Sequence, residues 1–318
     1  MNVVFFGTAD FGIPTLEALH KSARHRLIVA VTGPDRPRGR GLSSQPTPVG
    51  EWLTRTGIDK VLKPDKLSDP AFVELLRAAP ADAYVVVAYR ILPDSVYTIP
   101  RHAFNLHASL LPAYRGAAPI QRAIMAGEKI TGVTTFLLQT KVDAGDIVLQ
   151  RAVEIGPEEN TGELMSRLAA VGAGAVIETL DLLESGSFAA VVQDPTNATA
   201  APKITDADVL LSFAQPCRTL VNHVRALAPR PGATAVFREN TVKILALSAH
   251  SDASLGGLAG EIVAVDRTIG PIVAAGVGLV AFRSIQPAGK KPMTGAEFAR
   301  GYHPEIGERF LTPRLKQD

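Results

Sequence analysis

An amide and an imidazole stand two residues apart at the end of an apolar run in the middle of the chain. Asn105 and His107 close residues 103–107, a stretch with the length and apolar character of a buried strand. Alternate residues of a strand point to one face, so both side chains are expected together at its carboxyl end. Open α/β sheets build their sites at that end. An isolated Asn-x-His pair is more often structural, so these two residues alone do not establish a site.

A carboxylate follows the next predicted strand. Residues 132–138 have strand character, and the segment 139–147 after them contains Asp143, followed by Ala144 and Gly145. A carboxylate in this turn could reach the imidazole of His107 if the two strands lie close together in the sheet. The competing interpretation is that Asp143 and Asp146 only form the turn, and for Asp146 it is the simpler one.

The elements that must position these residues alternate between strands and helices. Residues 3–6, 27–31 and 83–88 are continuous apolar runs typical of strands covered on both faces, and residues 11–22 and 70–79 have helical spacing. This order predicts an α/β fold with a doubly wound, mostly parallel, Rossmann-like sheet. The first turn, residues 7–12, is not GxGxxG, which argues against a dinucleotide-binding dehydrogenase.

The pattern changes in the last third of the chain. Strands at 147–155 and helices at 120–126 and 161–183 complete the first domain, predicted as residues 1–193. Residues 194–205 are a polar passage without periodicity and are predicted to be a linker. Residues 206–318 contain one helix, 217–227, and several short strands with glycine-rich turns, so we expect a small OB-like β-barrel.

The composition excludes several classes of protein. The 318 residues are 46% hydrophobic and 20% charged, and no apolar run reaches the ~20 residues that cross a bilayer. The single cysteine, Cys217, excludes an internal disulfide or a cysteine-rich zinc site, and the seven histidines show no metal-pair spacing. A cytoplasmic protein without a metal is therefore expected, with a monomer as the default. Residues 203–318 contain 14 Lys and Arg and 10 Asp and Glu, which gives this part of the chain a net charge of +4. The net charge of the whole chain is +2.

Four spaced motifs together resemble the folate-dependent formyltransferase family. They are Asn105-x-His107, Ser109-Leu110-Leu111-Pro112, Arg115-Gly116 and Val142-Asp143-x-Gly145-Asp146. The resemblance implies a catalytic trio of Asn105, His107 and Asp143, with 10-formyltetrahydrofolate as the donor and no metal. It also implies donor contacts from two segments, Ser109, Leu110, Leu111 and Pro112 in one and Tyr89, Arg90, Ile91 and Leu92 in the other.

Formyl transfer gives each residue type a task. A neutral amine attacks the formyl carbon on N10 of the folate and produces a tetrahedral oxyanion, to which Asn105 could donate a hydrogen bond worth ~3 kcal/mol. His107 could move the proton from the attacking nitrogen toward N10, or stabilise the oxyanion as imidazolium. Asp143 could orient His107 or act through an ordered water. The sequence leaves open which residue accepts the amine proton.

The acceptor is indicated by basic segments elsewhere. Residues 33–48 form a long predicted loop with three arginines, Arg36, Arg38 and Arg40, and this loop resembles the one in family members that formylate methionyl-tRNA. Arginines on such a loop suit phosphate contacts and stacking on unpaired bases. The C-terminal segments that contain Lys203, Lys290 and Lys291 are similar to the same relatives. The resemblance thus implies methionyl-initiator tRNA as partner and N-formylmethionyl-tRNA for translation initiation as product.

Some residues favour other interpretations. Tyr114 and Arg90 stand where a tryptophan and a glycine are usual in the tRNA enzymes and resemble formyltransferases that act on amino-sugar nucleotides, while Leu42 and Ser43 replace the usual lysines. Those sugar enzymes lack the arginine loop. Glycinamide ribonucleotide formyltransferases are smaller single-domain proteins. An RNA-binding protein with a decayed catalytic half is disfavoured because all three members of the trio are present.

Overall fold

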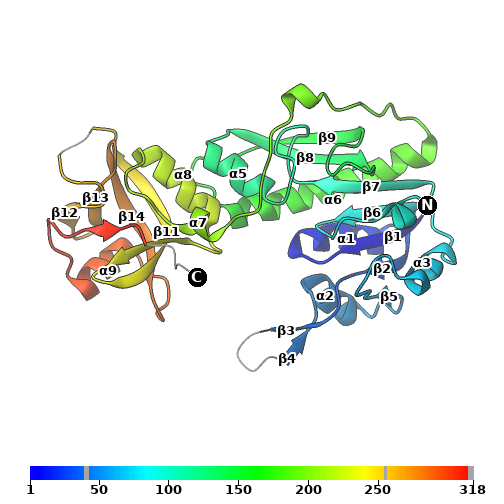
Figure 1. Ribbon diagram of the computed structural model, residues 1–318, viewed down its shortest axis with the longest axis horizontal. Coiled ribbons are helices and arrows are strands. Elements are labelled where there is room, and N and C mark those ends of the chain that lie inside the picture. The colour runs from blue at the N-terminus through cyan, green and yellow to red at the C-terminus, as the bar shows by residue number, and fades with distance from the viewer. Residues whose placement is uncertain (39–42, 254–255, 314–318) are drawn as a thin grey trace. The chain divides into compact units, whose positions relative to one another are not determined.

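The computed structural model describes residues 1–38, 43–253 and 256–313, and its contacts form two compact units (Figure 1). The first unit comprises Met1–Pro119, Ile130–Glu154 and Met165–Ala201. The second comprises Ile120–Lys129, Ile155–Leu164 and Pro202–Asp318. The chain therefore passes between the units more than once. The domain bounds predicted from the sequence do not contain this interleaving and stay a prediction.

A seven-stranded sheet forms the centre of the first unit. Its strands, in spatial order, are β5 (Val61–Leu62), β2 (Arg26–Val31), β1 (Asn2–Gly7), β6 (Ala83–Val87), β7 (His102–His107), β8 (Ile130–Leu137) and β9 (Ile147–Glu154). The strands from β5 to β7 are parallel, and β8 and β9 are antiparallel additions. The buried strands β1 and β6 are continuous apolar runs, as expected where helices cover both faces. The predicted mostly parallel sheet is confirmed.

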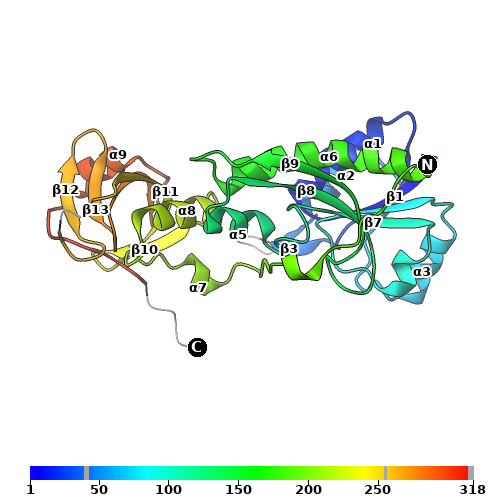
Figure 2. The same ribbon diagram turned by 90° about the horizontal axis from the view of Figure 1, so that it is seen from above.

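Helices cover this sheet on two sides. They are η1 (Asp10–Gly12), α1 (Ile13–Lys21), α2 (Pro48–Thr56), α3 (Pro70–Arg77), α4 (Asp94–Tyr97), α6 (Thr161–Ser185) and η2 (Pro195–Asn197). In Figure 2, α1 and α6 lie on one side of the sheet and α3 on the other. Thr47 and Asp69 cap the N-termini of α2 and α3, each followed by a proline at the first helical position. No helix in the described part of the chain is both long and apolar enough to span a membrane.

The segment predicted as a long arginine loop contains secondary structure. Its strands β3 (Arg36–Arg38) and β4 (Ser43–Gln45) pair antiparallel, and α2 begins three residues after β4. This pairing could not be predicted from the sequence, because β3 contains Pro37 and neither strand alternates apolar and polar residues. A proline is tolerated here because the two-stranded sheet leaves one edge of each strand unpaired.

A curled antiparallel sheet forms the second unit. Its strands, in spatial order, are β12 (Ile262–Asp266), β13 (Gly270–Ala274), β14 (Leu279–Pro287), β11 (Asn240–Ser251), β10 (Ala233–Phe237) and β15 (Phe310–Leu311). The two outer strands are joined, because Ile262 donates its N–H to the Glu308 carbonyl and Phe310 donates to the Gly260 carbonyl, both at 2.8 Å. The predicted small barrel is thereby confirmed.

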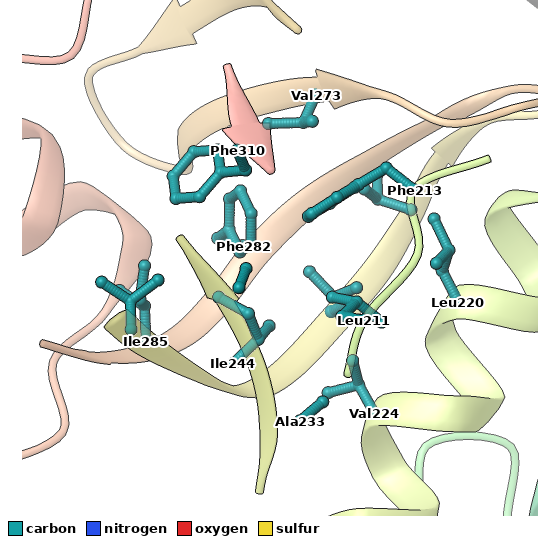
Figure 3. Close-up of a cluster of buried hydrophobic side chains, with 14 of the residues drawn as sticks. Leu211, Phe213, Leu220, Val224, Ala233, Ile244, Val273, Phe282, Ile285 and Phe310 are labelled. Atoms are coloured by element: carbon teal, nitrogen blue, oxygen red, sulfur yellow. The ribbon is translucent and has the colours of Figure 1, made fainter. Parts of the chain in front are cut away.

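Apolar side chains fill this barrel. The buried cluster in Figure 3 includes Leu211, Phe213, Leu220, Val224, Ala233, Ile244, Val273, Phe282, Ile285 and Phe310. The helices of the unit are α5 (Pro119–Ala126), α7 (Asp206–Val209), α8 (Cys217–Leu227) and α9 (Gly295–Tyr302). Leu220 and Val224 come from α8, one turn apart, so this helix contributes its apolar stripe to the barrel core.

Polar contacts tie the two earlier segments of the second unit to its C-terminal stretch. Arg225 is only 6% exposed and donates hydrogen bonds to the carbonyl oxygens of Gly156 and Glu159, each at 3.0 Å. The Thr161 hydroxyl donates to the Ala226 carbonyl at 2.6 Å. On α5, Arg122 forms a bidentate ion pair with Asp208 at 2.8 and 2.9 Å. The second unit therefore depends on residues from three parts of the sequence.

Candidate active site

Asn105 and His107 lie on one face of the sheet at the end of β7. Leu106, between them, points to the opposite face, where a side chain at Gly172 of α6 would collide with it. Asn105 is partly exposed, and within residues 1–38, 43–253 and 256–313 no hydrogen-bond partner for its side-chain amide is found. Both of its N–H donors are therefore available to a substrate.

The imidazole of His107 is held between a carbonyl and a carboxylate. Its Nε2 lies 2.9 Å from the Tyr114 carbonyl oxygen, and its Nδ1 lies 3.9 Å from Oδ2 of Asp143. A carbonyl only accepts hydrogen bonds, so this partner assigns the proton to Nε2. In the neutral ring, Nδ1 then carries the lone pair and faces the carboxylate. The side chains of His107 and Asp143 are 7% and 14% exposed, so water screens the pair only weakly.

Asp143 is fixed by the turn in which it sits, residues 139–146, which we call the acidic turn. Asp143 has a left-handed φ of +52°, and its Oδ2 accepts a hydrogen bond from the Gly116 N–H at 3.0 Å. Gly145 allows the turn to close, because a Cβ there would lie 1.7 Å from the Leu137 carbonyl oxygen. The acidic turn and the end of β7 are thereby brought together as the sequence indicated, although the catalytic roles stay a prediction.

The segment after β7, residues 108–116, forms what we call the catalytic loop. Ser109 is fully buried and its hydroxyl donates to the Ala113 carbonyl at 2.6 Å. Thr134 of β8 donates to the Ser109 carbonyl and accepts from the Leu111 N–H, at 2.7 and 3.1 Å. Gln150 of β9 donates to Thr134 and to the Leu111 carbonyl, each at 2.9 Å. Hydrogen bonds from two neighbouring strands, β8 and β9, thus hold the catalytic loop in place.

The four residues predicted to contact the folate in this loop divide into two pairs. Ser109 and Leu111 are buried, so their side chains hold the loop, while Leu110 and Pro112 are only partly buried. Leu110 rests over Gly132 of β8, where a Cβ would lie 2.6 Å from the leucine side chain. Direct side-chain contact with a donor is therefore more accessible to Leu110 and Pro112, and the predicted roles of all four are untested.

The second predicted folate segment, residues 89–92, follows β6. Arg90 donates to the carbonyl oxygens of Pro64 and Asp65 at 2.7 and 2.8 Å and to the Tyr89 hydroxyl at 3.0 Å. Burial raises the pKa of Tyr89, so its hydroxyl keeps its proton at neutral pH. Ile91 is 71% exposed, whereas Leu92 belongs to the core beneath α3. Both Nη atoms of Arg90 thus donate to the protein, its Nε is buried without a partner in the described residues, and Ile91 offers exposed apolar surface.

The predicted tRNA contacts lie on exposed surface where the structure describes their side chains. Arg36 of β3 is exposed and has no ion pair within the described residues, and the backbone of Arg38 is part of the same strand. Arg40 lies outside the described residues. In the second unit Lys203, Lys290 and Lys291 are exposed. Their assignment to tRNA stays a prediction.

Sequence reasoning missed three polar residues that support the site. Thr134, Gln150 and Gln193 hold the catalytic loop or the acidic turn, and none belongs to a motif that carries reactive chemistry. Thr134 is fully buried and Gln193 is 6% exposed. Thr134 and Thr135 are adjacent in a mostly apolar strand, and this pair of threonines was a possible signal for the first. Gln193 stands at the border of the predicted linker and gave none.

One group in the described part of the chain has the spacing of a metal site, but it lies outside these loops. His25, Asp181 and Glu184 place one ligand atom each within 4.8 Å of one another. Both carboxylates already pair with Arg24, at 2.6 and 2.9 Å. These contacts are those of an ion-pair network at the start of β2 and the end of α6.

Comparisons with known proteins cover nearly the whole chain. A family model described as formyl transferase matches residues 1–180, and one described as formyl transferase, C-terminal domain, matches residues 203–303. Methionyl-tRNA formyltransferase of Moorella thermoacetica is 42% identical over 97% of this chain and 98% of that protein. The protein of the same name from Streptomyces griseus is 40% identical over 97% of this chain and 99% of its own length.

Solved structures show the same fold at low identity. HypX from Aquifex aeolicus, in complex with tetrahydrofolic acid, has a TM-score of 0.62 and 18% identity over 99% of this chain and 50% of its own. WlaRD, a sugar 3N-formyl transferase, has a TM-score of 0.66 and 15% identity over 92% of this chain and 99% of its own. At such identities these likenesses show the fold alone.

Proposed function

The chain belongs to the formyl transferase family, and from this membership we propose that it transfers a formyl group from 10-formyltetrahydrofolate to the amino group of methionyl-initiator tRNA. The observation that carries the proposal is an identity of 40–42% over 96–98% of the chain to proteins named methionyl-tRNA formyltransferase. N-formylmethionyl-tRNA for translation initiation is then the product.

The free amide of Asn105 fits the first task of the reaction. A negative charge develops on the formyl oxygen as the amine attacks, and a fixed N–H donor near that oxygen stabilises it. Since Asn105 has no partner of its own within the described residues, it donates without first breaking a hydrogen bond. The partly exposed Leu110, Pro112 and Ile91 supply apolar surface for the donor at the same end of the sheet.

His107 and Asp143 fit the second task, which is the movement of a proton. With its proton on Nε2 held by the Tyr114 carbonyl, His107 takes the amine proton at Nδ1 as the amine nitrogen bonds to the formyl carbon. It then gives this proton to N10 as the bond between the formyl carbon and N10 breaks, so that neutral tetrahydrofolate leaves. The Asp143 carboxylate, 3.9 Å away, stabilises the cation that results. The distance is longer than a hydrogen bond, so this support is electrostatic or passes through one water.

The basic residues predicted to contact tRNA suit the phosphates of the acceptor. Arg36, Arg38 and Arg40, with Lys203, Lys290 and Lys291, offer cations to a phosphate backbone. Such contacts give affinity that falls steeply with salt and carry little sequence information.

The deciding experiment is a single-turnover assay with 10-formyltetrahydrofolate and two competing acceptors, methionyl-initiator tRNA and an amino-sugar nucleotide. Formylation of the tRNA alone supports the proposal. Formylation of the sugar alone would refute it and make Tyr114 and Arg90 the residues that identify the acceptor.

A further inference from the structure

The segment between α6 and the C-terminal stretch, predicted as a linker, lies against the catalytic loop. Within residues 193–201, which we call the strap, Thr199 accepts a hydrogen bond from the Arg115 N–H at 2.8 Å, and Ala201 donates to the Arg115 carbonyl at 2.6 Å. A parallel β-bridge joins Arg115 to Ala200. Contact is close, since a Cβ at Gly116 would lie 2.6 Å from the Ala201 carbonyl oxygen.

One residue of the strap contacts both the catalytic loop and the acidic turn. The Gln193 side chain donates from Nε2 to the carbonyl oxygens of Asp143 and Gly145, at 3.1 and 2.7 Å. Its Oε1 accepts from Nε and Nη2 of Arg115, at 3.1 and 2.6 Å. All hydrogen-bonding capacity of the amide nitrogen and the carbonyl oxygen is used, and the side chain is 6% exposed.

These contacts fix the backbone on both sides of the His107 imidazole. Asp143 has a positive φ of +52° and Tyr114 one of +60°, conformations that non-glycine residues rarely adopt without support. Gln193 holds the carbonyl of Asp143, and Thr199 accepts from the Tyr114 N–H at 2.8 Å. Tyr114 and Asp143 are the two partners of His107, so the strap controls where both lie.

We propose that the strap is a positioning element of the active site and that Gln193 is its principal positioning residue. Gln193 joins the catalytic loop to the acidic turn, so that the Asp143 carboxylate stays beside Nδ1 of His107. This proposal rests on the proposed function for its kinetic test. It adds to the reaction a residue that touches neither substrate nor the reacting atoms.

The test compares Gln193→Glu with Asn197→Ala in the full-length protein. Glutamate keeps the acceptor for Arg115 but replaces the two donated N–H groups by an oxygen that repels the carbonyls of Asp143 and Gly145. Asn197 lies in the same strap, is exposed, and bonds only Asp194 through its side chain, so it serves as the matched control. We expect kcat for formyl transfer to fall about 10- to 100-fold in Gln193→Glu, with KM for the folate donor within twofold and the control unchanged.

A double-mutant cycle separates positioning from mere stabilisation. If Gln193 acts through Asp143, its replacement costs much less in an Asp143→Asn background, whereas a general loss of stability adds to the loss from Asp143→Asn in full. Equal effects in both backgrounds, or an unchanged kcat in Gln193→Glu, would overturn the proposal. Should Gln193→Glu fail to fold, Arg115→Met removes the partner on the other side of the glutamine. An unchanged kcat in Arg115→Met would also overturn the proposal.

A spectroscopic measurement keeps this proposal distinct from the proposed function. The ¹⁵N resonances of the His107 ring report its partners without substrate and are identified by their absence in His107→Ala. They shift in Gln193→Glu and not in Asn197→Ala if the strap positions Asp143 and Tyr114. Unchanged His107 ring resonances in Gln193→Glu would refute the positioning role of the strap, even if the protein formylates tRNA. A wild-type protein that transfers no formyl group refutes the function and leaves this result standing.

Discussion

Replacing Asp143 by asparagine removes a charge while keeping the shape and the acceptor that the Gly116 N–H requires. Two unit charges separated by the observed 3.9 Å interact by about 4 kcal/mol at an effective dielectric constant near 20, and by about 1 kcal/mol in bulk water. The pair is mostly buried, so the loss of stabilisation for the His107 cation falls between these limits. At about 1.4 kcal/mol per factor of ten, kcat should fall roughly 5- to 700-fold.

The assay is steady-state formylation with the folate donor and methionyl-tRNA both saturating, so that kcat is measured and binding does not contribute. KM for each substrate and the melting temperature are measured on the same preparations, and both should stay close to wild type. A kcat within threefold of wild type would show that the carboxylate does not stabilise the imidazolium. A large rise in the KM for folate would show instead that Asp143 serves binding.

Three further outcomes follow from the structure. Asn105→Ala should lower kcat about 100-fold and leave the melting temperature nearly unchanged, because no protein group loses a partner; a large loss of stability would contradict this. The Arg122 guanidinium holds the pKa of Asp208 far below its ordinary range, so the stability it contributes is present above the unfolded value, about 3.9, and is lost as pH falls below it. The difference in melting temperature between wild type and Asp208→Asn should therefore be full at pH 7 and shrink below about pH 4; a constant difference would refute the assignment. Phe282→Ala, at a fully buried position in the barrel, should lower the free energy of unfolding by 3–5 kcal/mol in urea titrations, and a loss under 1 kcal/mol would mean that the core refills the space.

Much of the fold was predictable because its elements carry strong periodic signals. The runs that became β1 and β6 are apolar and short, and α8 has a clear apolar stripe. The β3–β4 pairing was not predictable, because its strands are polar, three residues long and interrupted by Pro37. The closure of the barrel between Gly260 and Phe310 also depends on residues 50 apart, a distance over which local patterns carry no information.

The site was predictable where residue type itself carries the chemistry. Asn105, His107 and Asp143 stood out because an amide, an imidazole and a carboxylate occur at strand ends. Gln193 did not, since its role is to satisfy backbone carbonyls that become visible only when two loops meet. Arg90 shows the opposite limit: it stands out in the sequence because it occupies a position where a glycine is usual in the tRNA enzymes, and in the structure its guanidinium is bound to the carbonyls of Pro64 and Asp65.

The buried Arg225 limits how pieces of this protein can be recombined. Its guanidinium depends on the carbonyls of Gly156 and Glu159, which lie some 70 residues earlier in the chain. A fragment that starts after the strap would lack both of these carbonyl acceptors, and the Arg225 guanidinium would keep only its hydrogen bond to Asn222 Oδ1. A chimera that exchanges acceptor preference between relatives must therefore carry Ile120–Lys129 and Ile155–Leu164 together with the barrel. These segments and the barrel are expected to have diverged as one inherited module.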